Sequence, residues 1–111
     1  MGTFSVEVHV RPAGASDKPL APVKCLVDTG AAFSQFPTPL LASLGITPDR
    51  LVPVVLADGA GRDQPAAWVE IRYGNLTAFT LVLFGGANGL TLLRAHALEG
   101  LGLEPSRFPL A

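Results

Sequence analysis

The residues best suited to chemistry are the consecutive Asp28, Thr29, Gly30 and Ala31, which follow an apolar run from Val23 to Val27. This order is typical of a strand that enters a buried turn. A carboxylate at such a turn is costly to bury without hydrogen-bond donors or a partner charge. Thr29 can supply a hydroxyl, and Gly30 permits backbone conformations closed to other residues and offers its N–H to a nearby oxygen. The stretch can therefore hold Asp28 in a fixed orientation.

A simpler interpretation of the same residues is an Asx turn, in which Asp28 bonds its own backbone two residues on and only reverses the chain. The context favours a site instead, because apolar residues precede the triplet and Ala31 and a helix signal follow it. Hydrolysis of a peptide bond by carboxylates alone needs two of them that share one proton. The ionised one activates water, and the protonated one assists the carbonyl oxygen.

The chain contains one Asp-Thr-Gly and no second copy of it. A single chain therefore holds half of a two-carboxylate site. A two-fold symmetric dimer brings each residue at its axis against its own copy, so Asp28 would meet the Asp28 of a second chain. We therefore expect a homodimer, if the carboxylate is catalytic.

Other chemistries fit the sequence less well. His9, His96 and Cys25 are the only histidines and the only thiol, and they lack the short spacing of a zinc site. Cys25 lies in an expected buried strand, which argues against a nucleophilic role and leaves no partner for a disulfide. The glycines of residues 85–89 fit neither common phosphate-binding pattern. We therefore expect neither a metal nor a cofactor.

The composition limits the class of protein. The 111 residues are enough for one domain, spanning 1–111, and 49% of them are hydrophobic. A formal charge of −1 gives no basic face for nucleic acid and no polybasic patch for a membrane. The first residues lack the pattern of a signal peptide, so we expect a cytoplasmic protein whose partners are peptides or proteins.

Hydrophobic periodicity indicates a mostly β chain. Alternating or short apolar segments predict extended structure over residues 4–10, 23–28, 33–37, 51–56, 66–73 and 76–84. The first two strands are expected to pair antiparallel, and turns are expected at 57–62 and 74–75. Two short helices are predicted, Thr38–Gly45 and Leu92–Leu101.

The ends of the two predicted helices resemble one another. Thr38 is expected to cap the first helix, Pro39 to occupy its first position, and Gly45 to follow its end. Residues 41–48 and 98–105 share two leucines, a glycine and a proline at the same spacing, which suggests two similar half-domains. Helix-stop signals are themselves stereotyped, so chance is the alternative.

With its hydrophobic pair before Asp-Thr-Gly-Ala, the stretch around Asp28 resembles the active-site motif of retropepsin-like (clan AA) aspartic proteases. The resemblance covers most of the chain and is to the small, single-lobed bacterial and archaeal group, with support from residues 44–46, 56–59 and 92–103. It implies an all-β fold with one or two short helices, a closed β-barrel of a single lobe, and a homodimer. It also implies that the apolar tail Phe108–Leu110 belongs to the dimer interface.

The resemblance assigns roles to two groups of residues. Asp28 is the implied catalytic acid, in a loop shaped by Thr29, Gly30 and Ala31. The implied flap over the substrate is formed by Ala57, Asp58, Gly59, Ala60 and Gly61.

One residue departs from the family pattern. Relatives carry Leu-Leu-Gly before the second helix, where this chain has Leu92, Leu93 and Arg94. An arginine there could crowd the site or bias the carboxylate pair toward its ionised form. Alternatively, Gly89 and Leu90 take that place and the correspondence slips by a few residues.

The sequence thus leaves three hypotheses. The first is a homodimeric aspartic endopeptidase that acts on peptides or proteins. The second is a non-catalytic retropepsin-fold protein for dimerisation or peptide binding, motivated by Arg94. The third is a β-rich interaction domain in which the motif is only a turn.

Overall fold

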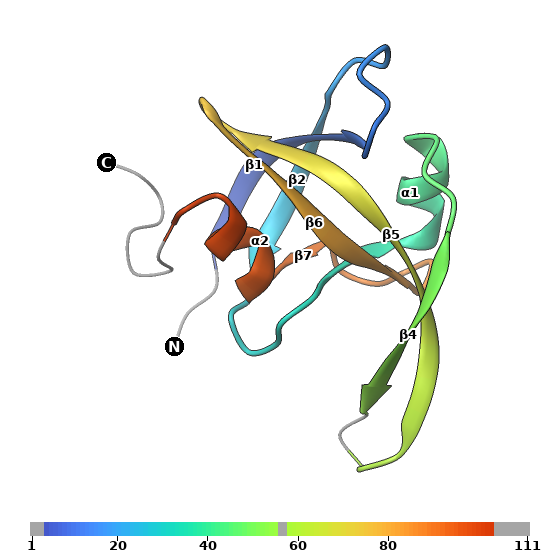
Figure 1. The fold of residues 1–111 in the computed structure, drawn as a ribbon. Helices are drawn as coiled ribbons and strands as arrows, with labels where there is room; N and C mark the ends of the chain where they lie inside the picture. Colours follow the sequence, from blue (N-terminus) through green and yellow to red (C-terminus); the bar gives the residue numbers. More distant parts are fainter. Residues whose placement is uncertain (1–3, 56–57, 104–111) are drawn as a thin grey trace.

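Strands make up most of the computed structural model, which describes residues 4–55 and 58–103 (Figure 1). The strands are β1 (Phe4–Pro12), β2 (Ala21–Val27), β3 (Ser34–Pro37), β4 (Arg50–Val55), β5 (Gly61–Tyr73), β6 (Leu76–Gly85) and β7 (Leu92–Leu93). The helices are α1 (Thr38–Ser43) and α2 (Ala95–Gly100). The expected mostly β fold with two short helices is confirmed.

The strands form one sheet that closes on itself. Their order is β1-β2-β7-β3-β6-β5-β4, and β1 also pairs antiparallel with β5. Because β1 pairs with both β2 and β5, six strands form a closed circuit, and β4 is attached outside it through β5. The predicted antiparallel pairing of the first two strands is confirmed, with Val6 opposite Cys25.

Two parallel pairings link the two halves of the chain. β7 pairs parallel with β2, and β3 pairs parallel with β6. The strand before α1, β3, therefore lies beside β6 of the second half of the chain. The strand before α2, β7, lies beside β2 of the first half. This reciprocity agrees with the two similar halves suggested by the helix-ending sequences.

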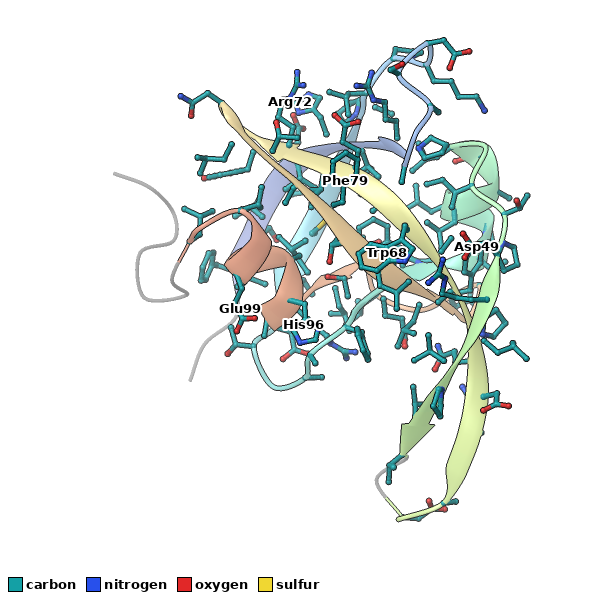
Figure 2. All side chains as sticks on the ribbon, in the orientation of Figure 1. Asp49, Trp68, Arg72, Phe79, His96 and Glu99 are labelled. Atoms are coloured by element: carbon teal, nitrogen blue, oxygen red, sulfur yellow. The ribbon has the colours of Figure 1, made fainter. Side chains whose placement is uncertain are left out.

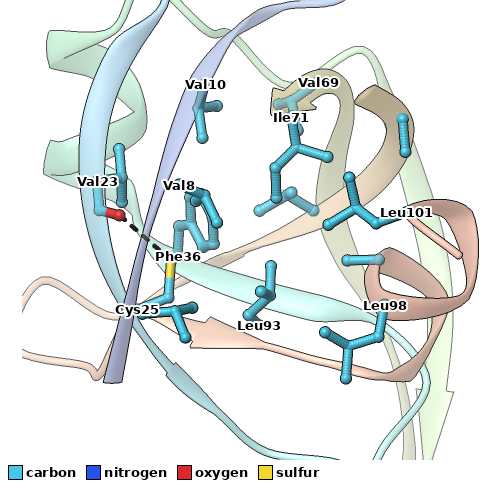
Figure 3. Packing of buried hydrophobic residues seen from close by; sticks show 14 of the residues in the cluster. Val8, Val10, Val23, Cys25, Phe36, Val69, Ile71, Leu93, Leu98 and Leu101 are labelled. Carbon is cyan, nitrogen blue, oxygen red and sulfur yellow. Dashed lines mark hydrogen bonds between the residues drawn. The ribbon is translucent and has the colours of Figure 1, made fainter. Parts of the chain in front are cut away.

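The core fills the inside of this circuit (Figure 3). Alternation along β1 and β2 turns one face of each strand inward, so that Val8 and Val10 of β1 and Cys25 of β2 are at most 1% exposed. The Cys25 thiol donates a hydrogen bond of 3.8 Å to the carbonyl of Val23. Large side chains from other strands and from both helices complete the core, including Phe36, Leu41, Ile71, Leu93 and Leu98.

The first helix begins differently from the prediction. Pro37 is its N-cap residue and no side chain caps it, so the expected role of Thr38 is wrong. The Thr38 hydroxyl instead donates to the carbonyl of Gly85 over 2.7 Å and ties the helix to the end of β6. Pro39 is the second helical residue and not the first, so its expected position is wrong by one, while Gly45 follows the helix with φ +76°, as expected.

The second helix is shorter than predicted. Leu92 and Leu93 form β7, and α2 starts only at Ala95. The leucines continue the helical spacing of α2, but their backbone groups pair with β2. Gly102 ends the helix with φ +75°, as expected. Pro105 and Phe108–Leu110 lie outside the described residues.

The outer face of β5 and β6 carries large side chains. Trp68 and Phe79 lie on this face (Figure 2) and are 41% and 59% exposed. Glu70 of β5 lies directly opposite Phe79 and is buried. Its two carboxylate oxygens accept hydrogen bonds from Arg11 at 3.0 and 3.1 Å, which compensate the cost of burying the charge. This ion pair joins β1 to β5 where the circuit closes. No described helix is long and apolar enough to cross a membrane.

Candidate active site

Asp28 is the first residue after β2, and the neighbouring strand fixes its position. The backbone N–H of Leu26 donates to Thr91 over 2.8 Å, and the N–H of Asp28 donates to the carbonyl of Leu93 over 2.9 Å. The parallel pairing therefore places Asp28 beside the residue that follows β7. Its side chain is 35% exposed, so the carboxylate is accessible to solvent.

The loop after Asp28 folds back on the carboxylate. The N–H of Gly30 donates to Oδ1 of Asp28 over 3.0 Å, which is the contact of an Asx turn. Gly30 does not have a positive φ, so it does not use the backbone freedom that glycine permits. Its small size matters instead, because a Cβ there would lie 3.3 Å from the same oxygen. Thr29 is half-buried, and Ala31 is exposed.

The start of α2 holds the far side of this loop. The N–H of Ala95 donates to the carbonyl of Ala31 over 3.3 Å, and that of His96 donates to Ala32 over 3.0 Å. The ring of His96 also packs edge-on against Phe33, with 5.0 Å between the ring centroids. The carboxylate loop and α2 are thus one connected unit.

Arg94 is the residue that β7 places beside Asp28. Its Nε donates to Oδ2 of Asp28 over 3.3 Å, and its Nη1 donates to the carbonyl of Phe33 over 3.2 Å. Its backbone N–H donates to the hydroxyl of Ser34, which is fully buried. The arginine side chain is only 18% exposed, so these contacts hold it in one place.

The position of Arg94 settles the question left open by the sequence. Arg94, and not Gly89, directly follows the strand that pairs with β2. Gly89 lies in a separate turn, where its N–H donates to the carbonyl of Gly86 over 3.0 Å. Arg94 therefore occupies the place, directly after the strand beside β2, at which the resemblance implies a glycine.

A cavity of about 450 Å³ adjoins this unit. One wall comes from the carboxylate loop and Arg94, and the opposite wall comes from β4. Among the described residues, the lining consists of Ala31, Ala32, Phe33, Gln35, Pro53, Val54, Val55, Gln64, Leu83 and Arg94. Arg94 is the charged member of this set, and most of the others are apolar.

The lining of the cavity includes a hydrogen-bonded pair of glutamines, the buried Gln64 and the half-buried Gln35. Gln64 is only 6% exposed, and its Nε2 donates to Oε1 of Gln35 over 3.2 Å and to the carbonyl of Phe84 over 3.0 Å. These bonds connect β5 with β3 and β6. Neither glutamine was predicted as a site residue, because their closeness depends on pairings between distant strands.

The expected flap is the hairpin of β4 and β5, which extends away from the closed circuit (Figure 1). At its tip the N–H of Ala60 donates to Oδ1 of Asp58 over 2.9 Å, and Gly59 has φ +87°. Asp58, Gly59, Ala60 and Gly61 are exposed there and do not line the cavity. Ala57 lies outside the described residues. The hairpin contributes Pro53 to Val55 of β4 instead, which the sequence prediction missed.

Other reactive groups are poorly placed for chemistry. Burial raises the pKa of the Cys25 thiol to about 12, so the thiolate that a nucleophile needs is scarce at neutral pH. Within residues 4–55 and 58–103, no three His, Cys, Asp or Glu side chains gather as metal ligands do. The chemistry of the described site is therefore that of a carboxylate.

Comparison with known proteins supports this picture. The model of the aspartyl protease family matches residues 8–84, which include the Asp28 loop but end before Arg94. The fold is similar to that of the EIAV protease solved in complex with the inhibitor HBY-793, with a TM-score of 0.64 and 20% identity. That match covers 93% of this chain and 91% of the EIAV chain. No curated protein sequence matches significantly. The fold is thus retropepsin-like, and the chain belongs to the aspartyl protease family.

Proposed function

We propose that the protein is an aspartic endopeptidase that works as a homodimer, with one Asp28 from each chain. The observation that carries this proposal is the carboxylate of Asp28, fixed at the end of β2, in a loop whose residues Ala31 to Phe33 line a cavity that is walled by a hairpin. Gly30 and Arg94 each hold one of its oxygens. Because each chain contributes a single carboxylate of this kind, the second must come from a second copy.

The two carboxylates would divide the work of hydrolysis. With one proton shared between them, the ionised Asp28 takes a proton from water, and the resulting oxygen attacks the carbonyl carbon of the peptide. The protonated Asp28 donates to the carbonyl oxygen. Transfer of a proton to the amide nitrogen then breaks the C–N bond. The β4–β5 hairpin would cover the bound peptide during these steps.

The test is cleavage of a diverse peptide mixture by the purified chain, from acidic to neutral pH and over a range of protein concentrations. A shared site predicts that the rate rises more steeply than linearly with protein concentration below the dimer dissociation constant. Asp28→Asn should abolish cleavage, and Asp49→Asn should not, because Asp49 is an exposed carboxylate paired with Arg50. Cleavage that survives in Asp28→Asn contradicts the proposal.

The ion pair between Arg94 and Asp28 favours a second candidate, a non-catalytic peptide-binding or dimerisation protein. The guanidinium of Arg94 occupies Oδ2 of Asp28, an oxygen that the two-carboxylate mechanism needs for water or for the peptide carbonyl. On this alternative a well-folded dimer binds peptides in the cavity but does not cleave them at any pH. Sustained turnover by the wild-type chain excludes it.

A further inference from the structure

Arg94 contacts the carboxylate of Asp28 and also lines the cavity. No other charged residue is found among the described residues of the lining, whose walls are mostly apolar. A guanidinium has five N–H donors arranged as a planar fork, and such a fork suits a carboxylate. The positive charge of Arg94 is therefore close to any ligand that binds in the cavity.

The charge balance of the site leaves a cation in excess. This step rests on the proposed function. In the homodimer, two Asp28 carboxylates that share one proton carry one negative charge, and two Arg94 side chains carry two positive charges. One positive charge is then left without a counter-charge. The Arg94 side chain is only 18% exposed, so an uncompensated charge there is costly, and a ligand that supplies a carboxylate relieves that cost.

We propose that the site selects peptides with an aspartate or glutamate side chain next to the bond that is cleaved, and that Arg94 binds this side chain. Arg94 is then a specificity-determining residue for the reaction. The apolar residues Pro53 to Val55 and Leu83 surround the methylene groups of the acidic side chain, and the guanidinium pairs with its end. A neutral isostere of the same size fills the cavity but leaves the excess charge unpaired.

Paired peptides that differ only in Glu against Gln beside the cleaved bond test the specificity. The wild-type chain should cleave the Glu peptide with a kcat/KM at least about tenfold higher, a ratio typical of one charge-assisted contact. Arg94→Gln should bring this ratio close to one, and Arg94→Lys should keep part of it. Arg72→Gln is the matched control, because Arg72 lies at the other end of β5, its side chain is 44% exposed, and it does not line the cavity. Equal rates for both peptides with the wild-type chain overturn the proposal.

A binding measurement separates this proposal from the proposed function. Asp28→Asn removes the internal partner of Arg94 without changing the size of the side chain. Calorimetric titration should therefore show that this variant binds the Glu peptide more tightly than the wild-type chain does, and more tightly than it binds the Gln peptide. Adding Arg94→Gln to Asp28→Asn should remove the difference between the peptides.

The two possible failures have different signatures. If the wild-type chain binds the Glu peptide preferentially but never cleaves it, the endopeptidase function fails and the role of Arg94 stands. If Asp28→Asn binds the Glu and Gln peptides equally, the role of Arg94 fails, whether or not the wild-type chain is a protease.

Discussion

Nε of Arg94 lies 3.3 Å from Oδ2 of Asp28, although the two residues are 66 positions apart in the sequence. The contact exists because β7 runs parallel to β2, so both strands deliver their next residue to the same end of the sheet. With the Arg94 side chain 18% exposed and that of Asp28 35% exposed, the pair is screened only in part. It is the contact that links the carboxylate loop to the residue following β7.

Replacing Arg94 with glycine removes the ion pair to Asp28. Because a partly exposed ion pair contributes about 1 kcal/mol, freeing Asp28 should raise kcat/KM on neutral peptides about fivefold. Side-by-side kinetics of the wild-type chain and Arg94→Gly on a neutral peptide measure the effect. An unchanged or lower rate, in a variant with wild-type circular dichroism, would show that the ion pair does not restrain the carboxylate.

The space beside Gly30 makes a second prediction. In Gly30→Ala, the new Cβ would lie 3.3 Å from Oδ1 of Asp28 and push the carboxylate out of line. We expect kcat/KM to fall about 10- to 100-fold, since small misplacements of a catalytic group have effects of this size. Gly86→Ala is the control, because a Cβ at Gly86 meets nothing within 4 Å. Equal loss in both variants would point to a general effect of removing glycine.

Cys25 gives the protein a defined response to alkaline pH. Burial raises the pKa of the thiol from its ordinary value of 9.0 to about 12 in the folded protein. Between these two pH values the folded protein keeps the thiol proton and the unfolded chain has lost it. The stabilisation from the neutral thiol is complete below pH 9 and is lost as pH rises toward 12. In that range the free energy of unfolding should fall by up to about 1.4 kcal/mol per pH unit.

Urea unfolding followed by the fluorescence of Trp68, the single tryptophan, measures this slope. Cys25→Ala should show a shallower decline between pH 9 and 12 than the wild-type chain, because other groups titrate equally in both. If the free energy of unfolding declines equally in the two proteins, the Cys25 thiol is not the source of the pH dependence.

The ion pair of Arg11 and Glu70 should stabilise the closed circuit. Glu70→Gln weakens two hydrogen bonds between charged groups that are 17% and 10% exposed, and we expect a loss of about 2 kcal/mol in the free energy of unfolding. Glu7→Gln, at an exposed site on β1, should change it little. A loss no larger than that of Glu7→Gln would mean that the ion pair does not stabilise the pairing of β1 with β5.

The sequence predicted the local features of the fold well. Alternation in β1, the turns at Gly59 and Gly74, and the glycine after each helix depend on neighbouring residues, and the structure has all of them. Leu92 and Leu93 were assigned to a helix, because their spacing fits α2 and the pairing that makes them a strand comes from β2. Thr38 was assigned as a cap for a similar reason, since its actual partner, Gly85, lies 47 positions away.

The candidate site was predicted in part. The motif around Asp28 was recognisable because its residues are consecutive. The lining residues Gln35, Gln64 and Leu83 come from three different strands, so no local pattern marks them. The closeness of Arg94 to Asp28 followed only from the resemblance to the family, and the structure was needed to choose between Arg94 and Gly89.

The position of β4 outside the closed circuit bears on how the protein behaves at high concentration. Leu51 and Val55 of this edge strand are 63% and 78% exposed, and an apolar strand edge invites other chains to add and aggregate. Pro53 lies between them and has no N–H to offer to an added strand. This proline thus limits the growth of intermolecular sheets along the free edge of β4.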